Sequence, residues 1–132
     1  MHRPGLATLD SSAQDSPAHV LAQWSAAVEA KDPDAIAALY HPDCQVLGFA
    51  VRLRGSAALR DELAAPLLLL GQVKVRQGTR LAQGPDSLLV ELTVESRLGR
   101  MRATHGFVVR AGRIAHHFIG NVHRDAGTHA TA

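Results

Sequence analysis

The spacing of apolar residues changes along the chain, from a helical period in the first half to strict alternation after residue 71. Ser16 and Pro17 supply a helix-capping side chain and a first-turn proline, and apolar residues then recur three or four positions apart. These apolar residues are Val20, Leu21, Trp24, Ala27 and Val28. The pattern predicts an amphipathic helix that ends near Lys31.

A second, shorter helix is predicted directly after the first. Asp32 and Pro33 repeat the cap and the proline, and Tyr40 is expected on the apolar face near the end of this helix. Two short strands should follow, at residues 44–49 and 51–54.

The third predicted helix begins at Gly55 and Ser56 and carries Leu59 on its apolar face. We expect Pro66 to break it, because proline has no N–H to donate within a helix. The four leucines at residues 67–70 are then expected to be buried under the sheet.

After residue 71 the alternation of apolar and polar residues is typical of half-buried β-strands. Turn residues divide this region into four candidate strands, at residues 72–82, 87–98, 100–110 and 113–121. Short turns join successive strands into hairpins, so a curved antiparallel sheet packed on the three helices is predicted. This order gives an α+β fold and excludes a parallel βαβ arrangement.

The alternation also assigns side chains to the two faces of the sheet. The outer face receives charges that can pair between strands: Lys74, Arg76, Glu91, Glu95 and Arg102. The inner face receives, from the last two strands, Met101, Ala103, His105, Phe107, Val109, Ala115, His117, Ile119 and Asn121. A single bulge would reverse this assignment within a strand.

The length of 132 residues corresponds to one domain, expected over residues 15–122 with flexible tails at 1–14 and 123–132. Cys44 is the only cysteine, so the fold needs no disulfide and suits a reducing cytoplasm. No apolar run is long enough for a signal peptide or a membrane span. The net charge of +2, with acidic and basic residues interspersed, argues against nucleic-acid binding.

Two histidines on the predicted inner face are the candidate catalytic residues. His105 and His117 lie among apolar neighbours, where an imidazole can act as a general acid or base near neutral pH. The alternative remains open that each is a buried histidine whose nitrogens are satisfied by backbone or water. No inward carboxylate or thiolate accompanies them, so neither a metal site nor a cofactor is expected.

Further residues are expected to contact a ligand on the same face. Trp24 can stack on a flat molecule, although such an aromatic residue equally serves as a core anchor. Tyr40 is expected at the rim of the pocket. The complete predicted ligand-binding set is Trp24, Tyr40, Phe107, Ile119 and Asn121.

The order of these features resembles a known family. Residues 24–43, Gly55 with the helix after it, and the final hairpin at 105–114 resemble SnoaL-like and ketosteroid-isomerase-like proteins of the nuclear-transport-factor-2-like superfamily. The resemblance covers residues 18–121. It implies a cone-shaped pocket for a small apolar or polycyclic molecule and a homodimer packed through its sheets. The superfamily contains isomerases, dehydratases, epoxide hydrolases, cyclases and non-enzymes, so fold alone does not define the function.

The resemblance also argues against the reaction that ketosteroid isomerases catalyse. Ketosteroid isomerases use a tyrosine, a protonated aspartate and a second, proton-transferring aspartate; those positions are occupied here by Trp24, His105 and Gly48. Two hypotheses remain: a cofactor-independent isomerase, lyase or cyclase that uses a pocket histidine, or a non-catalytic ligand-binding or dimerisation domain.

Overall fold

The computed structural model describes residues 16–48 and 50–125. Three helices and six strands follow one another in the order α2 (Pro17–Glu29), α3 (Pro33–Ala38), β1 (Tyr40–Gly48), β2 (Val51–Arg54), α4 (Ser56–Leu69), β3 (Lys74–Gln83), β4 (Ser87–Ser96), β5 (Gly99–Arg110) and β6 (Arg113–Asp125). The predicted α+β class is confirmed. The last strand continues to Asp125, three residues beyond the expected domain boundary, and the tail at 1–14 lies outside the described residues.

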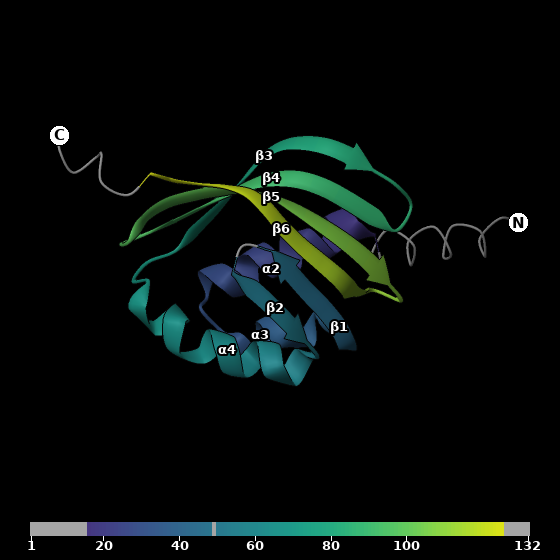
Figure 1. The fold of residues 1–132 in the computed structure, drawn as a ribbon, viewed down its shortest axis with the longest axis horizontal. Helices are drawn as coiled ribbons and strands as arrows, with labels where there is room; N and C mark the ends of the chain where they lie inside the picture. The colour runs from purple at the N-terminus through teal and green to yellow at the C-terminus, as the bar shows by residue number, and fades with distance from the viewer. Residues whose placement is uncertain (1–15, 49, 126–132) are drawn as a thin grey trace, which may run out of the picture.

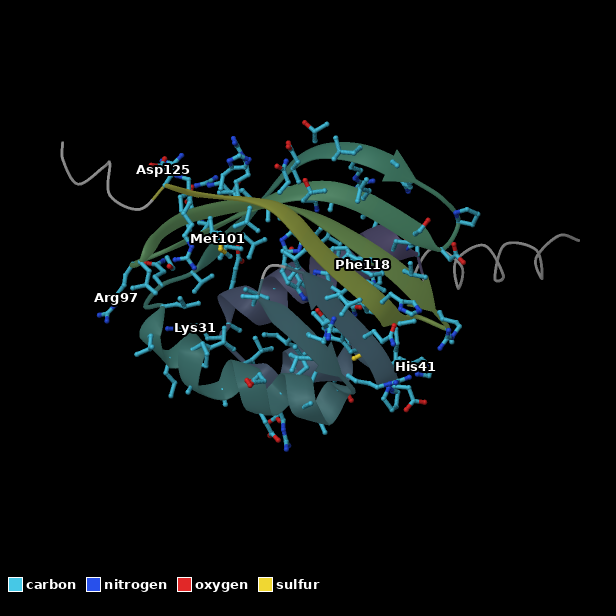
Figure 2. The ribbon with its side chains drawn as sticks, viewed as in Figure 1. Lys31, His41, Arg97, Met101, Phe118 and Asp125 are labelled. Atoms are coloured by element: carbon cyan, nitrogen blue, oxygen red, sulfur yellow. The ribbon has the colours of Figure 1, made fainter. Side chains whose placement is uncertain are left out.

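The strands form one sheet in the order β2-β1-β6-β5-β4-β3. The sheet is mostly antiparallel, as predicted, but β1 pairs with β6 in parallel. Figure 1 shows the sheet curving over α2, with α3 and α4 on the same side. The turn after β4, marked by Arg97, lies at the same end of the sheet as Asp125, and His41 lies at the opposite end (Figure 2).

Capping side chains begin the first two described helices as the sequence predicts. Ser16 Oγ accepts the backbone N–H of His19 at 3.2 Å, and Asp32 Oδ1 accepts that of Ala35 at 3.0 Å. The predicted length of α3 is wrong, because Tyr40 begins β1 instead of ending the helix. The reason is sheet pairing, since Ile114 of β6 donates its N–H to the carbonyl of Leu39 at 2.8 Å.

Helix α4 differs from its prediction in two ways. It continues through Pro66 to Leu69, and only Leu67 of the four leucines is fully buried. Leu68 is 78% exposed and Leu69 is 58% exposed. Successive helical residues point about 100° apart, so one face of the helix can bury only one leucine in each turn.

Two register shifts in β6 change which side chains face inward. Val108 pairs with His116 and Val109 with Ile114, so Ala115 is an extra residue. A second shift lies between Arg102 and Thr104 of β5, opposite the part of β6 that contains Asn121. Asn121 has a φ of 51°, and its side chain is exposed.

The core lies between the helices and the inner face of the sheet. Inward residues of β5, including Ala103, Phe107 and Val109, are buried as the alternation predicts. The predicted charges lie on the outer face, where Arg76 Nε contacts Glu95 Oε1 at 3.2 Å. This exposed pair contributes little stability. None of the helices in the described part of the chain is long and apolar enough to cross a membrane.

Candidate functional site

A cavity of about 490 Å³ lies between the helices and the inner face of the sheet near β1 and β6. Its wall is mostly aliphatic carbon, and the volume falls within the range of small-molecule sites. The lining residues are Trp24, Val28, Ile36, Tyr40, Val46, Ala50, Val51, Arg52, Leu53, Leu59, Glu62, Leu63, Pro66, Leu67, His117 and Ile119. Two of these, Arg52 and Glu62, are charged and exposed, whereas Trp24, Tyr40 and His117 are buried.

The three buried polar lining residues belong to one chain of hydrogen bonds. Trp24 Nε1 donates to Tyr40 Oη at 3.0 Å, and Tyr40 Oη lies 2.8 Å from His117 Nδ1. His117 Nε2 lies 2.9 Å from His105 Nδ1. The chain therefore joins side chains from α2, β1, β6 and β5.

Donor and acceptor counts fix the direction of the first bond in this chain. The indole of Trp24 can only donate, so the Tyr40 oxygen accepts from it. The directions of the other two bonds depend on the tautomers of His117 and His105. We assign the Tyr40 proton to His117 Nδ1 and the His117 proton to Nε2, facing His105 Nδ1, because this direction gives the hydroxyl proton a partner within the protein. This arrangement satisfies the hydroxyl proton and both nitrogens of His117 within the protein.

Aromatic rings hold the His117 imidazole on two sides. Phe107 stacks on it with ring centroids 4.3 Å apart, and Trp24 meets it edge-on at 5.8 Å with an interplanar angle of 90°. Packing on both sides fixes the ring orientation, so both nitrogens stay aligned with their partners.

Burial keeps the hydrogen-bonded groups uncharged at neutral pH. It lowers the pKa of His105 to about 4. Burial, and secondarily the charge that His105 would carry, lowers the pKa of His117 well below its usual range. Burial also raises the pKa of Tyr40 above its ordinary value. The inner end of the cavity is therefore polar but neutral.

The structure places the predicted site residues at different depths. Trp24, Tyr40, His117 and Ile119 line the cavity. His105 and Phe107 are buried beside His117 and are not part of the lining. The placement of Asn121 on the pocket face is wrong, because the shift in β6 leaves it exposed and outside the lining.

Sequence reasoning missed the wall that β2 and α4 contribute. Arg52, Glu62 and Leu63 line the cavity, but neither their type nor their spacing distinguishes them from other residues of a short strand and an amphipathic helix. Tyr40 was expected at the rim, whereas its hydroxyl lies at the centre of the hydrogen-bond chain. The only signal for that role was that the chain contains one tryptophan and one tyrosine.

Gly48 lies where β1 passes close to β6. Its φ is 144°, and a Cβ atom at this position would overlap the backbone of Ile119. No residue with a side chain fits there without movement of a strand. The resemblance assigns Gly48 to the position of the proton-transferring aspartate of ketosteroid isomerases, and this backbone has no room for a carboxylate side chain there.

The match to a known family extends over the elements that build this cavity. The SnoaL-like domain matches residues 21–117, which include Trp24, Tyr40, His105 and His117. The chain belongs to the SnoaL-like family. No curated protein matches it. No group of three or more metal-binding side chains occurs among residues 16–48 and 50–125.

Solved structures share the fold of this SnoaL-like protein at low sequence identity. A Mycobacterium tuberculosis protein in complex with estradiol-17beta-hemisuccinate has a TM-score of 0.67 and 18% identity, covering 79% of this chain and 92% of that one. A proposed polyketide cyclase from Sinorhizobium meliloti has a TM-score of 0.65 and 24% identity, covering 76% and 92%. A Catenulispora acidiphila protein with a ketosteroid-isomerase-like fold, in complex with trimethylamine, has a TM-score of 0.66 and 16% identity, covering 79% and 85%.

Proposed function

We propose that this protein binds one small, uncharged, largely apolar molecule in the cavity. The observation that carries the proposal is the composition of the wall, which is aliphatic except for one buried, neutral hydrogen-bond chain and two charged, exposed side chains. Transfer of apolar surface from water into such a wall is favourable. A buried ionic group on the ligand would meet no opposite charge among Trp24, Tyr40 and His117.

The volume limits the size of the molecule. An engineered cavity of about 150 Å³ in another protein accommodates benzene, and this cavity measures about 490 Å³. A molecule with two or three rings, or an aliphatic chain of similar volume, would fill it. The ligands named for the Mycobacterium and Catenulispora proteins show that this fold accommodates small molecules in other chains.

Occupation of the cavity is tested with a variant that fills it. Leu63 is half-buried on α4 and lines the cavity, so Leu63→Trp should place an indole in the ligand's space. We expect the affinity for 2-naphthol, measured by isothermal titration calorimetry, to fall at least tenfold. Leu68→Trp is the matched control, because Leu68 is exposed on the same helix and does not line the cavity. Equal affinities in both variants would contradict binding in this cavity.

A second candidate function is acid–base catalysis of an isomerase, lyase or cyclase reaction. It is favoured by the continuous hydrogen bonding from Tyr40 in the cavity wall through His117 to His105. Both nitrogens of His117 are engaged, so proton exchange with a ligand would occur at Tyr40, and His105 would be the final proton acceptor.

His105→Ala distinguishes the two functions: an enzyme loses turnover while it still binds ligand, whereas a binding protein changes only in affinity or stability.

We also propose that two copies associate through the outer face of the sheet. Leu89, Gly106 and Phe118 are cross-strand neighbours on this face, and Leu47 of β1 pairs with Phe118. Phe118 is 44% exposed and Leu89 is 39% exposed. These residues, with Gly106 between them, form an apolar row that a second copy would remove from water.

A further inference from the structure

We propose that the inner end of the cavity selects ligands that donate a hydrogen bond, such as alcohols and phenols, over matched ligands that can only accept one. This inference rests on the proposed function, because it concerns which molecules the same cavity accepts. It follows from the hydrogen bonds that the buried polar residues of the wall make within the protein.

With the chain in its assigned direction, the buried polar residues that the structure describes in the wall have no free donor. Trp24 donates its N–H to Tyr40. In the assigned direction of the chain, Tyr40 donates its proton to His117 and His117 donates its proton to His105. Each of these groups has one proton available, and each proton has a partner within the protein. A carbonyl oxygen that enters the inner end therefore finds no free proton there.

One acceptor position remains open. The Tyr40 oxygen accepts one hydrogen bond from Trp24, and a hydroxyl oxygen can accept two. His117 offers none, because its Nδ1 is already bonded to Tyr40 and its Nε2 to His105. Tyr40, Trp24 and His117 all belong to the cavity wall, and they meet at this oxygen. A ligand hydroxyl can use the remaining lone pair without any rearrangement of the wall.

A carbonyl ligand would require the chain to reverse. Tyr40 would have to turn its proton into the cavity, His117 would have to carry its proton on Nδ1, and His105 would have to donate from its own Nδ1. Two imidazole rings would thus change tautomer for one new hydrogen bond. A carbonyl that enters without this reversal loses its bonds to water and gains none, which is costly.

The charged side chains of Arg52 and Glu62 do not mask the preference for hydrogen-bond donors when the probe is largely apolar. Arg52 can donate and Glu62 can accept, but both are exposed, whereas Trp24, Tyr40 and His117 are buried. A probe with one polar group on an otherwise apolar ring system tests the inner end, because its rings favour the aliphatic wall.

The test compares three naphthalenes of similar size on the full chain at pH 7. The probes are 2-naphthol, which donates and accepts, and 2-naphthaldehyde and 2-methoxynaphthalene, which only accept. We expect isothermal titration calorimetry to give 2-naphthol a dissociation constant about tenfold lower than those of the other two, as one well-formed hydrogen bond would produce. Equal affinities, or tighter binding of the aldehyde, would overturn the inference and leave the proposed function standing.

The proposed function and this inference are contradicted by different outcomes of the test. If none of the three naphthalenes binds, the proposed function fails and this inference fails with it. If they bind, Tyr40→Phe provides the second comparison, because it frees the Trp24 N–H, which can then donate to a carbonyl, and also His117 Nδ1, which can then accept from a hydroxyl. The advantage of 2-naphthol over the aldehyde should then fall below threefold. An unchanged advantage in Tyr40→Phe would overturn the assignment to the Tyr40 oxygen, and the wild-type comparison holds even if this variant does not fold.

Discussion

At the scale of single residues, the buried imidazoles are the feature with the clearest measurable effect. His105 and His117 are 5% and 2% exposed and hydrogen bond to each other. The other titratable group within this cluster is Tyr40, bonded to His117, while Trp24 and Phe107 cover the rings without charge. No acidic side chain is bonded to either imidazole in the described residues, so nothing there stabilises a positive charge.

This burial predicts acid sensitivity of the fold. In the unfolded chain both histidines bind protons below about pH 6.5, but in the folded protein burial lowers the pKa of His105 to about 4 and that of His117 below its usual range. Between these pH values the unfolded state binds more protons, so the free energy of unfolding should fall as the pH is lowered. The His105 shift alone corresponds to about 3 kcal/mol.

Urea denaturation at pH 7 and pH 4.5 measures this effect. The double variant His105→Leu/His117→Leu should lose most of the dependence, because the groups that bind the protons are absent. His19→Gln is the control, since His19 is exposed on α2 and its removal should leave the dependence unchanged. A wild-type stability that stays constant between the two pH values would contradict the prediction.

At the scale of elements, the pairing of β1 with β6 positions the Tyr40 hydroxyl. Tyr40 pairs with Ile114, and Val46 pairs with His117, so the two strands bring phenol and imidazole together. Gly48 pairs with Ile119 at the end of the same ladder, where an added Cβ atom would overlap the Ile119 backbone. The ladder therefore depends on a residue without a side chain.

Gly48→Ala should destabilise the protein by about 3 kcal/mol or more, because the methyl group meets the Ile119 backbone and φ is 144°. The melting temperature, measured by circular dichroism, should fall by roughly 10 °C. Gly120→Ala is the matched control in the neighbouring part of β6, because nothing lies within 4 Å of an added Cβ there. Equal effects of the two substitutions would show that the approach of β1 to β6 is not a constraint.

The sequence predicts these elements where the decisive interactions are local. Ser16 and Asp32 cap helices through residues three positions away, and the turns after residue 83 join neighbouring strands, so their patterns can be read directly. Alternation also places His105 and His117 on one face. The role of Tyr40 was not predictable in this way, because it depends on a strand more than seventy residues away. The same holds for the exposure of Asn121, which follows from the pairing of β6 with β5.

At the scale of the whole molecule, the two faces of the sheet have different surfaces. The inner face is covered by helices and contains the cavity, whereas the outer face is open and carries charges at one end and an apolar row around Phe118. Figure 2 shows Phe118 on β6, away from the end marked by Arg97 and Asp125. Association through the apolar row would leave the cavity on the opposite side of the sheet.

A charge on this row should prevent association of two copies. Phe118→Lys places an ammonium group at the centre of the proposed contact, and we expect light scattering at micromolar concentration to change from a dimer to a monomer. Leu98→Lys is the control, because Leu98 is 58% exposed in the turn between β4 and β5 and lies outside the row. A wild-type protein that is already monomeric would refute the proposed dimer.

The parallel ladder between β1 and β6 also affects how the protein forms during synthesis. β1 emerges from the ribosome early, but its partner β6 is the last described strand to be made. The pairing of β1 with β6 therefore cannot form until most of the chain has been synthesised. Such distant pairings slow folding, because a long loop must close before the contact forms. Until β6 arrives, one edge of the β1–β2 hairpin is unpaired and open to other chains. The strand that completes the cavity is thus also the one that ends this period of exposure.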